Sequence, residues 1–277
     1  MNNNIVLRQN EDDSIKKLAA MRQIYIDVGN IDYINFLLSV CFPLLLAVLT
    51  IIFDDSAICV IISHLLIFFM MVIPFVIERK NKSNKEFASN IMLSFDLYVY
   101  DLPWDKKVFG ERKDYEDIIK RKSSGYLKKN SHKNALINWF SLNLKDLDNN
   151  STIVECQKES VLWDSRLREH CKVIAIIFTV LIFVSLYLFC SLYNDSILGF
   201  FSYIVFLTPI VNWLVKLIFG LSDDIERLNS IHELLYSTKK KSSVDILLIE
   251  KQLTEHRKQA IKIPDLIYFL FKRFANL

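Results

Sequence analysis

The residues best suited to catalysis or metal binding are scattered along this chain. The five histidines stand at positions 64, 132, 170, 232 and 256, which is not the spacing of metal ligands. The five cysteines form no CxxC pair, and three of them lie within apolar runs. The sequence contains no phosphate-binding glycine loop, no GxSxG and no HExxH. We therefore expect no catalytic residue, no metal site and no cofactor, and hence a protein that is not an enzyme.

A row of polar residues within an apolar segment could form a path for ions or water. Thr208, Asn212 and Lys216 are spaced by four, so they share one face of a helix. A charge at the centre of a bilayer costs about 2.5 kcal/mol or more, so it usually faces protein or water. Lys216 is close to the end of its segment, however, and its amine could reach the membrane surface. Pore lining is therefore one interpretation of this row, and helix packing or snorkelling is the other.

Four apolar segments are long enough to cross a bilayer, which requires about 20 residues. They cover 34–53, 57–77, 173–193 and 197–221, and polar turns at 54–56 and 194–196 pair them into two hairpins. The chain is 52% hydrophobic, and its 5 Gly and 5 Pro are too few for a typical all-β protein. The sequence therefore predicts an all-α membrane protein with two transmembrane helical hairpins.

The distribution of Lys and Arg predicts which parts face the cytoplasm. Of the 34 such residues, nineteen lie between the hairpins, and neither hairpin turn contains one. Because cytoplasmic segments carry the excess of Lys and Arg, both termini and the central insert are expected in the cytoplasm. Insert and tail would form one helical cytoplasmic domain. The predicted parts are an N-terminal helix (1–33), hairpin 1 (34–77), the insert domain (78–172), hairpin 2 (173–221) and a helical tail (222–277).

Apolar residues at helical spacing predict the cytoplasmic helices. The residues that share one helix face are Phe87, Ile91, Phe95 and Tyr98 in the first stripe, Ile225, Leu228, Ile231 and Leu235 in the second, and Ile246, Ile249 and Leu253 in the third. We expect one helix near 12–33, another that continues the second span to about residue 100, and others near 111–129 and 243–260. Pro103 should end the second of these, because proline disfavours helix at the residue before it. The stretch 130–150 is rich in Asn, Ser and Asp and is expected to be a loop.

The segment 153–172 runs without Pro or Gly into the third apolar segment. A helix that is continuous across this junction could carry a movement from the aqueous side into the bilayer. Asp164 and Arg168 have the i, i+4 spacing of an ion pair worth a few tenths of a kcal/mol when exposed. Trp163 is expected to pack on the rest of the domain. On pattern alone this segment is a structural linker helix.

The same segment carries a family resemblance. CQKESVLWDSRLR (156–168) resembles the CQ-x-x-N-x-x-WD-x-x-LR signature of the SMODS-associating four-transmembrane effectors. RQNEDDSIKKLAAMRQIY (8–25), SFDLYVYDLPWD (94–105) and NWF (138–140) resemble other elements of that family. Ser160 and Met21 depart from its pattern, where Asn and Gln are expected. The resemblance singles out, for signal transmission or ligand binding, Cys156, Gln157, Trp163, Asp164, Arg166, Arg168, Asp96, Pro103 and Trp104.

The resemblance implies a pore-forming effector of a bacterial anti-phage defence system. In such systems a nucleotidyltransferase makes a cyclic or linear oligonucleotide second messenger, and the effector permeabilises the inner membrane in an abortive infection. Four helices can hardly enclose a wide channel, so a homo-oligomer is expected. The alternative is a non-pore membrane receptor or scaffold that signals to a soluble partner. The net charge of +3 gives no indication of a DNA or RNA partner.

Overall fold

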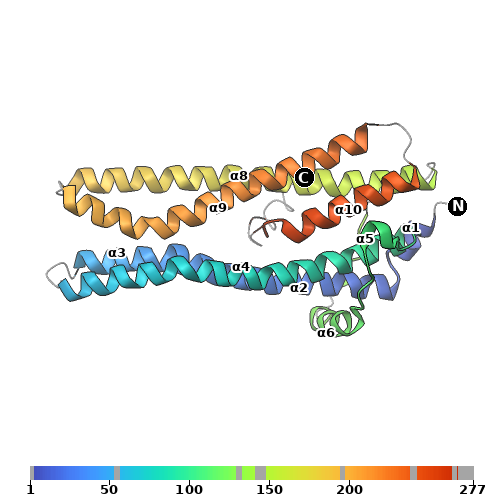
Figure 1. Ribbon diagram of the computed structural model, residues 1–277, viewed down its shortest axis with the longest axis horizontal. Coiled ribbons are helices and arrows are strands. Elements are labelled where there is room, and N and C mark those ends of the chain that lie inside the picture. Colours follow the sequence, from blue (N-terminus) through green and yellow to red (C-terminus); the bar gives the residue numbers. More distant parts are fainter. Residues whose placement is uncertain are drawn as a thin grey trace. The chain divides into compact units, whose positions relative to one another are not determined.

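The computed structural model describes residues 3–52, 57–128, 133–140, 148–193, 197–237, 242–263 and 267. All regular structure in these residues is helical, as the sequence predicts. The two predicted hairpin turns, 54–56 and 194–196, lie outside the described residues, as do most residues after 263. The helices, labelled in Figure 1, are α1 (Asn3–Arg8), α2 (Asp12–Phe36), the π-helical turn η1 (Leu37–Cys41), α3 (Phe42–Ile52), α4 (Ala57–Val99), α5 (Lys106–Phe109), α6 (Glu116–Tyr126), α8 (Asn149–Tyr193), α9 (Ile197–Tyr236) and α10 (Ser243–Gln259).

Three long helices each join an apolar stretch to a polar one. The helix α4 has 43 residues and ends at Val99, just before the predicted stop at Pro103. The helix α8 has 45 residues and contains both 153–172 and 173–193 without interruption. The helix α9 has 40 residues and continues through Pro209. The predicted continuity of the segment 153–172 with the apolar segment that follows is therefore confirmed.

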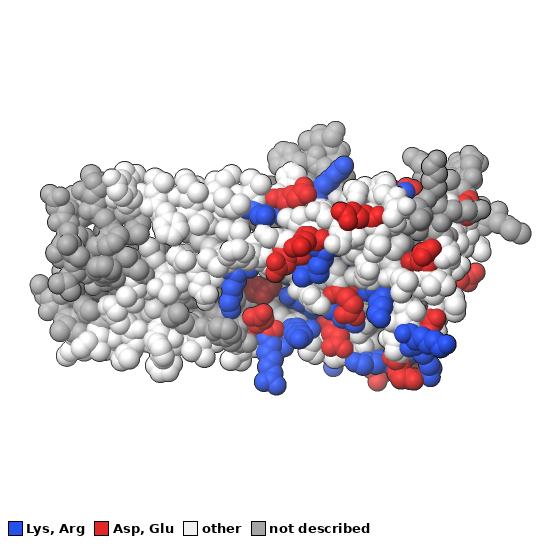
Figure 2. All heavy atoms as spheres, turned by 45° about the horizontal axis from the view of Figure 1, so that its top comes forward, with Lys and Arg blue, Asp and Glu red and all other residues white. Residues whose placement is uncertain are grey.

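Residue contacts divide the chain into two compact units. The polar unit consists of Met1–Val28, Lys82–Leu167 and Asp224–Lys262, and the apolar unit consists of Gly29–Asn81, Arg168–Asp223 and Ile263–Leu277. Each unit takes its residues from three separate parts of the chain. Figure 2 shows the contrast in charge, because Lys, Arg, Asp and Glu gather over one part of the displayed face and are sparse elsewhere on it.

The core of the polar unit consists of one apolar face from each of its long helices. The stripes predicted at helical spacing are buried in it, and they include Leu18, Ile91, Phe95, Leu228, Ile231, Leu235, Ile246, Ile249 and Leu253. Each such side chain contributes about 1.5–3 kcal/mol by its burial. Tyr98 is the exception: it was expected on the apolar face of α4, but it is exposed, and its hydroxyl donates to Glu11. A capping box between Ser242 and Asp245 begins α10.

The apolar unit has small packed clusters and a large exposed apolar surface. Val40 of η1 packs with Ile210 and Leu214 of α9, and the rings of Phe36 and Trp213 meet edge to face at 5.2 Å. Long runs of α4 and α8 keep large apolar side chains exposed, among them Ile58, Ile61, Phe68, Val173, Ile177, Leu181 and Leu188. A surface of this kind is typical of contact with lipid or with another copy of the protein.

The apolar helices differ in how clearly they qualify as membrane spans. Within the described residues, one helix, Asp12–Leu49, has the length and composition to cross a membrane, and Ile61–Met70 is a shorter apolar helix. The prediction of four spans with cytoplasmic termini is not confirmed by this finding, and it stays a prediction.

Candidate functional site

A buried cluster of charged and polar side chains joins three helices of the polar unit. Asp96 of α4 is 1% exposed, and Gln157 of α8 and Glu250 of α10 are 0% exposed. Arg257 of α10 donates to Asp96 Oδ2 at 2.7 Å and to Glu250 Oε1 at 3.4 Å. Gln157 Nε2 donates to Glu250 Oε2 at 3.0 Å. We call these four residues the buried junction, because they tie α10 to both α4 and α8.

Helix periodicity explains why α10 can supply both charged members of the junction. Glu250 and Arg257 are seven residues apart and therefore lie on one helix face. That face also carries the buried Ile246 and Leu253, so the helix packs the buried Glu250 and the half-buried Arg257 together with its apolar stripe. On α4, Asp96 is buried as well, next in sequence to the buried Phe95.

The buried junction contains two carboxylates and one guanidinium. Burial raises the pKa of Asp96 well above its usual value, the neighbouring Glu250 raises it further, and Arg257 opposes the rise. The neighbouring Cys156 is also affected, because burial raises the pKa of its thiol to about 12. This thiol stays protonated at neutral pH, so it acts in packing and not as a nucleophile.

A second polar link joins α8 to α10. The Nε2 atom of His256 lies 2.9 Å from Asp164 Oδ2, and His256 is almost fully buried. The sequence suggested Arg168 as the partner of Asp164 and gave no role to His256. Of the other residues singled out in this segment, Trp163 is half-buried, Arg166 is exposed and Arg168 is buried in the apolar unit.

Two further motifs meet at the N-terminal arm. Gln9 Oε1 accepts a hydrogen bond from the Phe140 amide at 2.9 Å, and Asn10 exchanges two hydrogen bonds of 2.9 Å with Asn138. Asn138 has a φ of 54°, a left-handed conformation that Asn tolerates better than most residues. Arg8 forms an ion pair of 2.7 Å with Asp101. The RQN, NWF and LPW elements, far apart in sequence, are thus in contact within the polar unit.

The LPW element forms a short turn beside α4. Pro103 is exposed, and Trp104 Nε1 donates to the Gly110 carbonyl at 2.9 Å. The Trp104 ring also lies against Phe109, with centroids 5.5 Å apart. Gly110 has a φ of 76°, which suits glycine because a side chain would be strained there. This geometry supports a structural role for Trp104.

The polar row of α9 lies away from the packed face of its helix. Ile210 and Leu214 are buried in the apolar unit, whereas Thr208 and Lys216 are exposed and Asn212 is half-buried. Lys216 Nζ lies 3.9 Å from Glu78 Oε2, at the residue that follows the second predicted span. These positions are compatible with both interpretations of the row.

The structure therefore brings Asp96, Gln157 and Asp164 together with α10, and it adds residues that the sequence analysis missed. The missed residues are Glu250, His256 and Arg257. A signal was present for two of them, because a Glu and an Arg within the apolar stripe of a helix indicate a buried pair. No local pattern indicated which carboxylate or amide they would meet.

The hydrogen bonds of Gln9 and Asn10 hold the N-terminal arm against 138–140, and we call them the N-terminal clamp. The Gln9–Phe140 bond gives a direct test of it. We expect Gln9→Ala to leave the Phe140 amide without its acceptor, at a cost of about 1–3 kcal/mol. Amide hydrogen exchange at Phe140 should then be at least about tenfold faster. Asn134→Ala, which changes an exposed neighbour, is the matched control. Unchanged exchange at Phe140 would contradict the assignment of this clamp.

The buried junction predicts a dependence of stability on pH. Because the pKa of Asp96 is raised by folding, its stabilising contribution is full below about pH 4 and is lost as the pH rises through the folded pKa. Asp96→Asn should remove this loss, so the free energy of unfolding should fall less with rising pH. Chemical unfolding in detergent from pH 4 to 9 measures it, with the exposed Asp117→Asn as control. If the free energy of unfolding falls equally steeply with pH in Asp96→Asn and in the wild type, the pKa of Asp96 is not raised by folding.

Comparison with known protein families identifies the same family that the motifs in the polar unit resemble. The family model described as the SMODS-associating 4TM effector domain matches residues 3–275, which is nearly the whole chain. Searches of curated proteins and of solved structures gave no match. The match includes the RQN, FD, LPW, NWF and CQ–WD–LR elements described above. The chain belongs to the SMODS-associating 4TM effector domain family.

Proposed function

We propose that this effector forms a pore in the bacterial inner membrane when a nucleotidyltransferase-linked anti-phage system is activated. Family membership supports an effector associated with SMODS nucleotidyltransferase systems. The pore, the four spans and the activating oligonucleotide are our proposal. In it, the polar unit is cytoplasmic and receives the signal, and the apolar unit lies in the membrane.

The continuous helix α8 is the observation that carries this proposal. Its polar part holds Gln157 and Asp164, which bond to Glu250 and His256 of α10. Its apolar part, 173–193, contains no charged residue and exposes large apolar side chains. One continuous helix thus carries both the family motif and a bilayer-compatible segment. A shift of α10 against α8 would move the apolar part without a flexible joint between them.

The position of the polar row supports a pore made by several copies. Thr208 and Lys216 are exposed on α9, and the packed residues Ile210 and Leu214 occupy its other side. Polar residues within a membrane segment usually face protein or water, and this row lies on the exposed side of α9. Neighbouring copies of the same row would provide both. We therefore propose a homo-oligomer with Thr208, Asn212 and Lys216 along the pore.

Membrane depolarisation in cells tests this function. Expression of the protein with an active nucleotidyltransferase of the same defence system should collapse the membrane potential, read by a voltage-sensitive dye, before growth stops. A catalytically dead nucleotidyltransferase is the control. Growth arrest with an intact potential would favour the non-pore receptor or scaffold and would reject the pore.

A further inference from the structure

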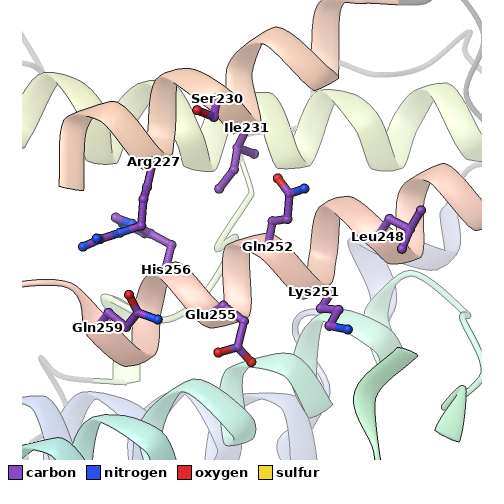
Figure 3. A pocket seen from close by; sticks show the side chains of 9 residues that line it. All are labelled: Arg227, Ser230, Ile231, Leu248, Lys251, Gln252, Glu255, His256 and Gln259. Carbon is purple, nitrogen blue, oxygen red and sulfur yellow. The ribbon is translucent and has the colours of Figure 1, made fainter. Parts of the chain in front are cut away.

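A groove lies between the end of α9 and α10, within the polar unit. Its volume is about 460 Å³, which is within the range of small-molecule sites. In Figure 3, Arg227 extends from α9 toward α10, and Gln252 extends from α10 toward α9. The groove is lined by Arg227, Ser230, Ile231, Leu248, Lys251, Gln252, Glu255, His256 and Gln259.

Two buried nitrogen atoms of the lining residues have no hydrogen-bond partner among the described residues. They are Nε of Arg227 and Nδ1 of His256. The remainder of each side chain is held in place: the Arg227 guanidinium donates to Asp224, and His256 Nε2 is bonded to Asp164. Buried polar atoms in proteins almost always make a hydrogen bond. Two buried nitrogen atoms without one, on residues that line a groove, therefore indicate a missing hydrogen-bond partner.

The charges of the lining residues favour an anionic partner. Arg227 and Lys251 are cationic; Asp224 already pairs with the Arg227 guanidinium, and Asp164 with His256 Nε2. Glu255, the acidic lining residue, bonds to Lys258 at 2.7 Å, which offsets its charge. Gln252 adds an amide donor that points into the space between the helices. A phosphate group matches this set best, because several oxygens can accept from a guanidinium, an imidazole and an amide together.

We propose that this groove binds the phosphate group of a small ligand, with Arg227, His256 and Gln252 as its donors. The inference rests on the proposed function, in which the polar unit receives a signal. To that function it adds the place where the ligand binds and the chemical group that is recognised. A free phosphate-bearing molecule and an anionic lipid headgroup share this chemistry, and the experiment below separates them.

The same residues connect the groove to α8. His256 Nε2 lies 2.9 Å from Asp164 Oδ2, and its Nδ1 has no partner among the described residues. A ligand bound at Nδ1 therefore shares one imidazole with the WD motif of α8. His256 is a positioning residue between ligand and helix.

Calorimetric titration of the full-length protein in detergent tests the site. The probes are inorganic pyrophosphate, adenosine monophosphate and, without phosphate, adenosine. We expect both phosphate probes to bind and adenosine not to bind. Arg227→Lys keeps the positive charge beside Asp224 but removes Nε, and it should weaken binding about tenfold or more. Gln252→Ala, at an exposed position, should weaken binding about fivefold.

The control is Lys120→Met, which removes an exposed cation of α6 that does not line the groove. Its binding should equal that of the wild type, and thermal melting verifies the fold of each variant. Repetition in nanodiscs separates the two sources of phosphate. Loss of pyrophosphate binding in phosphatidylglycerol but not in phosphatidylcholine discs supports the site and assigns it to a lipid headgroup. Equal binding in both supports the site and assigns it to a free ligand.

Two results would overturn the inference: no binding of either phosphate probe by folded protein, or binding that neither Arg227→Lys nor Gln252→Ala weakens. Neither result bears on pore formation, which is read by depolarisation or by leakage and needs no titration.

Discussion

Replacement of Arg257 by Met should destabilise the polar unit by about 3–5 kcal/mol and abolish effector activity. The change leaves two carboxylates, Asp96 and Glu250, buried without their cation, and breaking a buried pair in this way is among the costliest substitutions. Chemical unfolding in detergent measures the loss. Lys258→Met is the matched control, because it removes a neighbouring cation of α10 whose ion pair with Glu255 is partly exposed. That pair contributes at most about 1 kcal/mol.

A second substitution separates the loss of the cation from the loss of packing. Asp96→Asn in the Arg257→Met background removes one of the two buried carboxyl groups that the first change left without a cation. We expect the double variant to recover part of the lost stability, since the two sites are in direct contact and their effects should not add. Equal destabilisation by Arg257→Met and Lys258→Met, or full additivity in the double variant, would contradict the account of the buried junction.

A break in α8 should uncouple the signal from the membrane. Lys172→Pro removes a backbone hydrogen bond and introduces a clash within the continuous helix, at a cost of about 3 kcal/mol or more. We expect nucleotidyltransferase-dependent depolarisation to fall at least tenfold. The variant should still enter the membrane, because 173–193 remains apolar. Lys172→Ala removes the same side chain without breaking the helix and should keep full activity.

Membrane fractionation of both variants distinguishes uncoupling from failed insertion. Retained depolarisation in Lys172→Pro would show that α8 is not the transmitting element. Loss of activity in both variants would place the effect in the Lys172 side chain instead of the helix.

The helices of this protein were predictable from the sequence because their signals are local. The segment 153–193 lacks Pro and Gly, and it forms one helix, as that composition predicts. Pro103 marks the region where α4 ends, and the stripe of Ile246, Ile249 and Leu253 on α10 is buried as expected. The break between α1 and α2 at 9–11, by contrast, was not predicted, and α1 packs into the core of the polar unit through Ile5.

The buried junction could not be predicted in the same way. Asp96 and Arg257 are 161 residues apart, and Gln157 and Glu250 are 93 apart, so no local spacing relates them. The family motif singled out Asp96, Gln157 and Asp164 but not the α10 residues that they contact. Tyr98 shows that a local pattern can also mislead. Helical spacing placed it on the apolar face of α4, but the residue is exposed and its hydroxyl donates to Glu11.

Leakage from liposomes tests the central claim most directly. Purified wild-type protein is reconstituted into liposomes that contain a self-quenching dye, and the product of the nucleotidyltransferase is added. The account predicts rapid dye release by the wild type and by Lys172→Ala, and little release by Lys172→Pro or Arg257→Met. If the folded and inserted wild type releases neither dye nor ions with that product, the protein does not act as a pore.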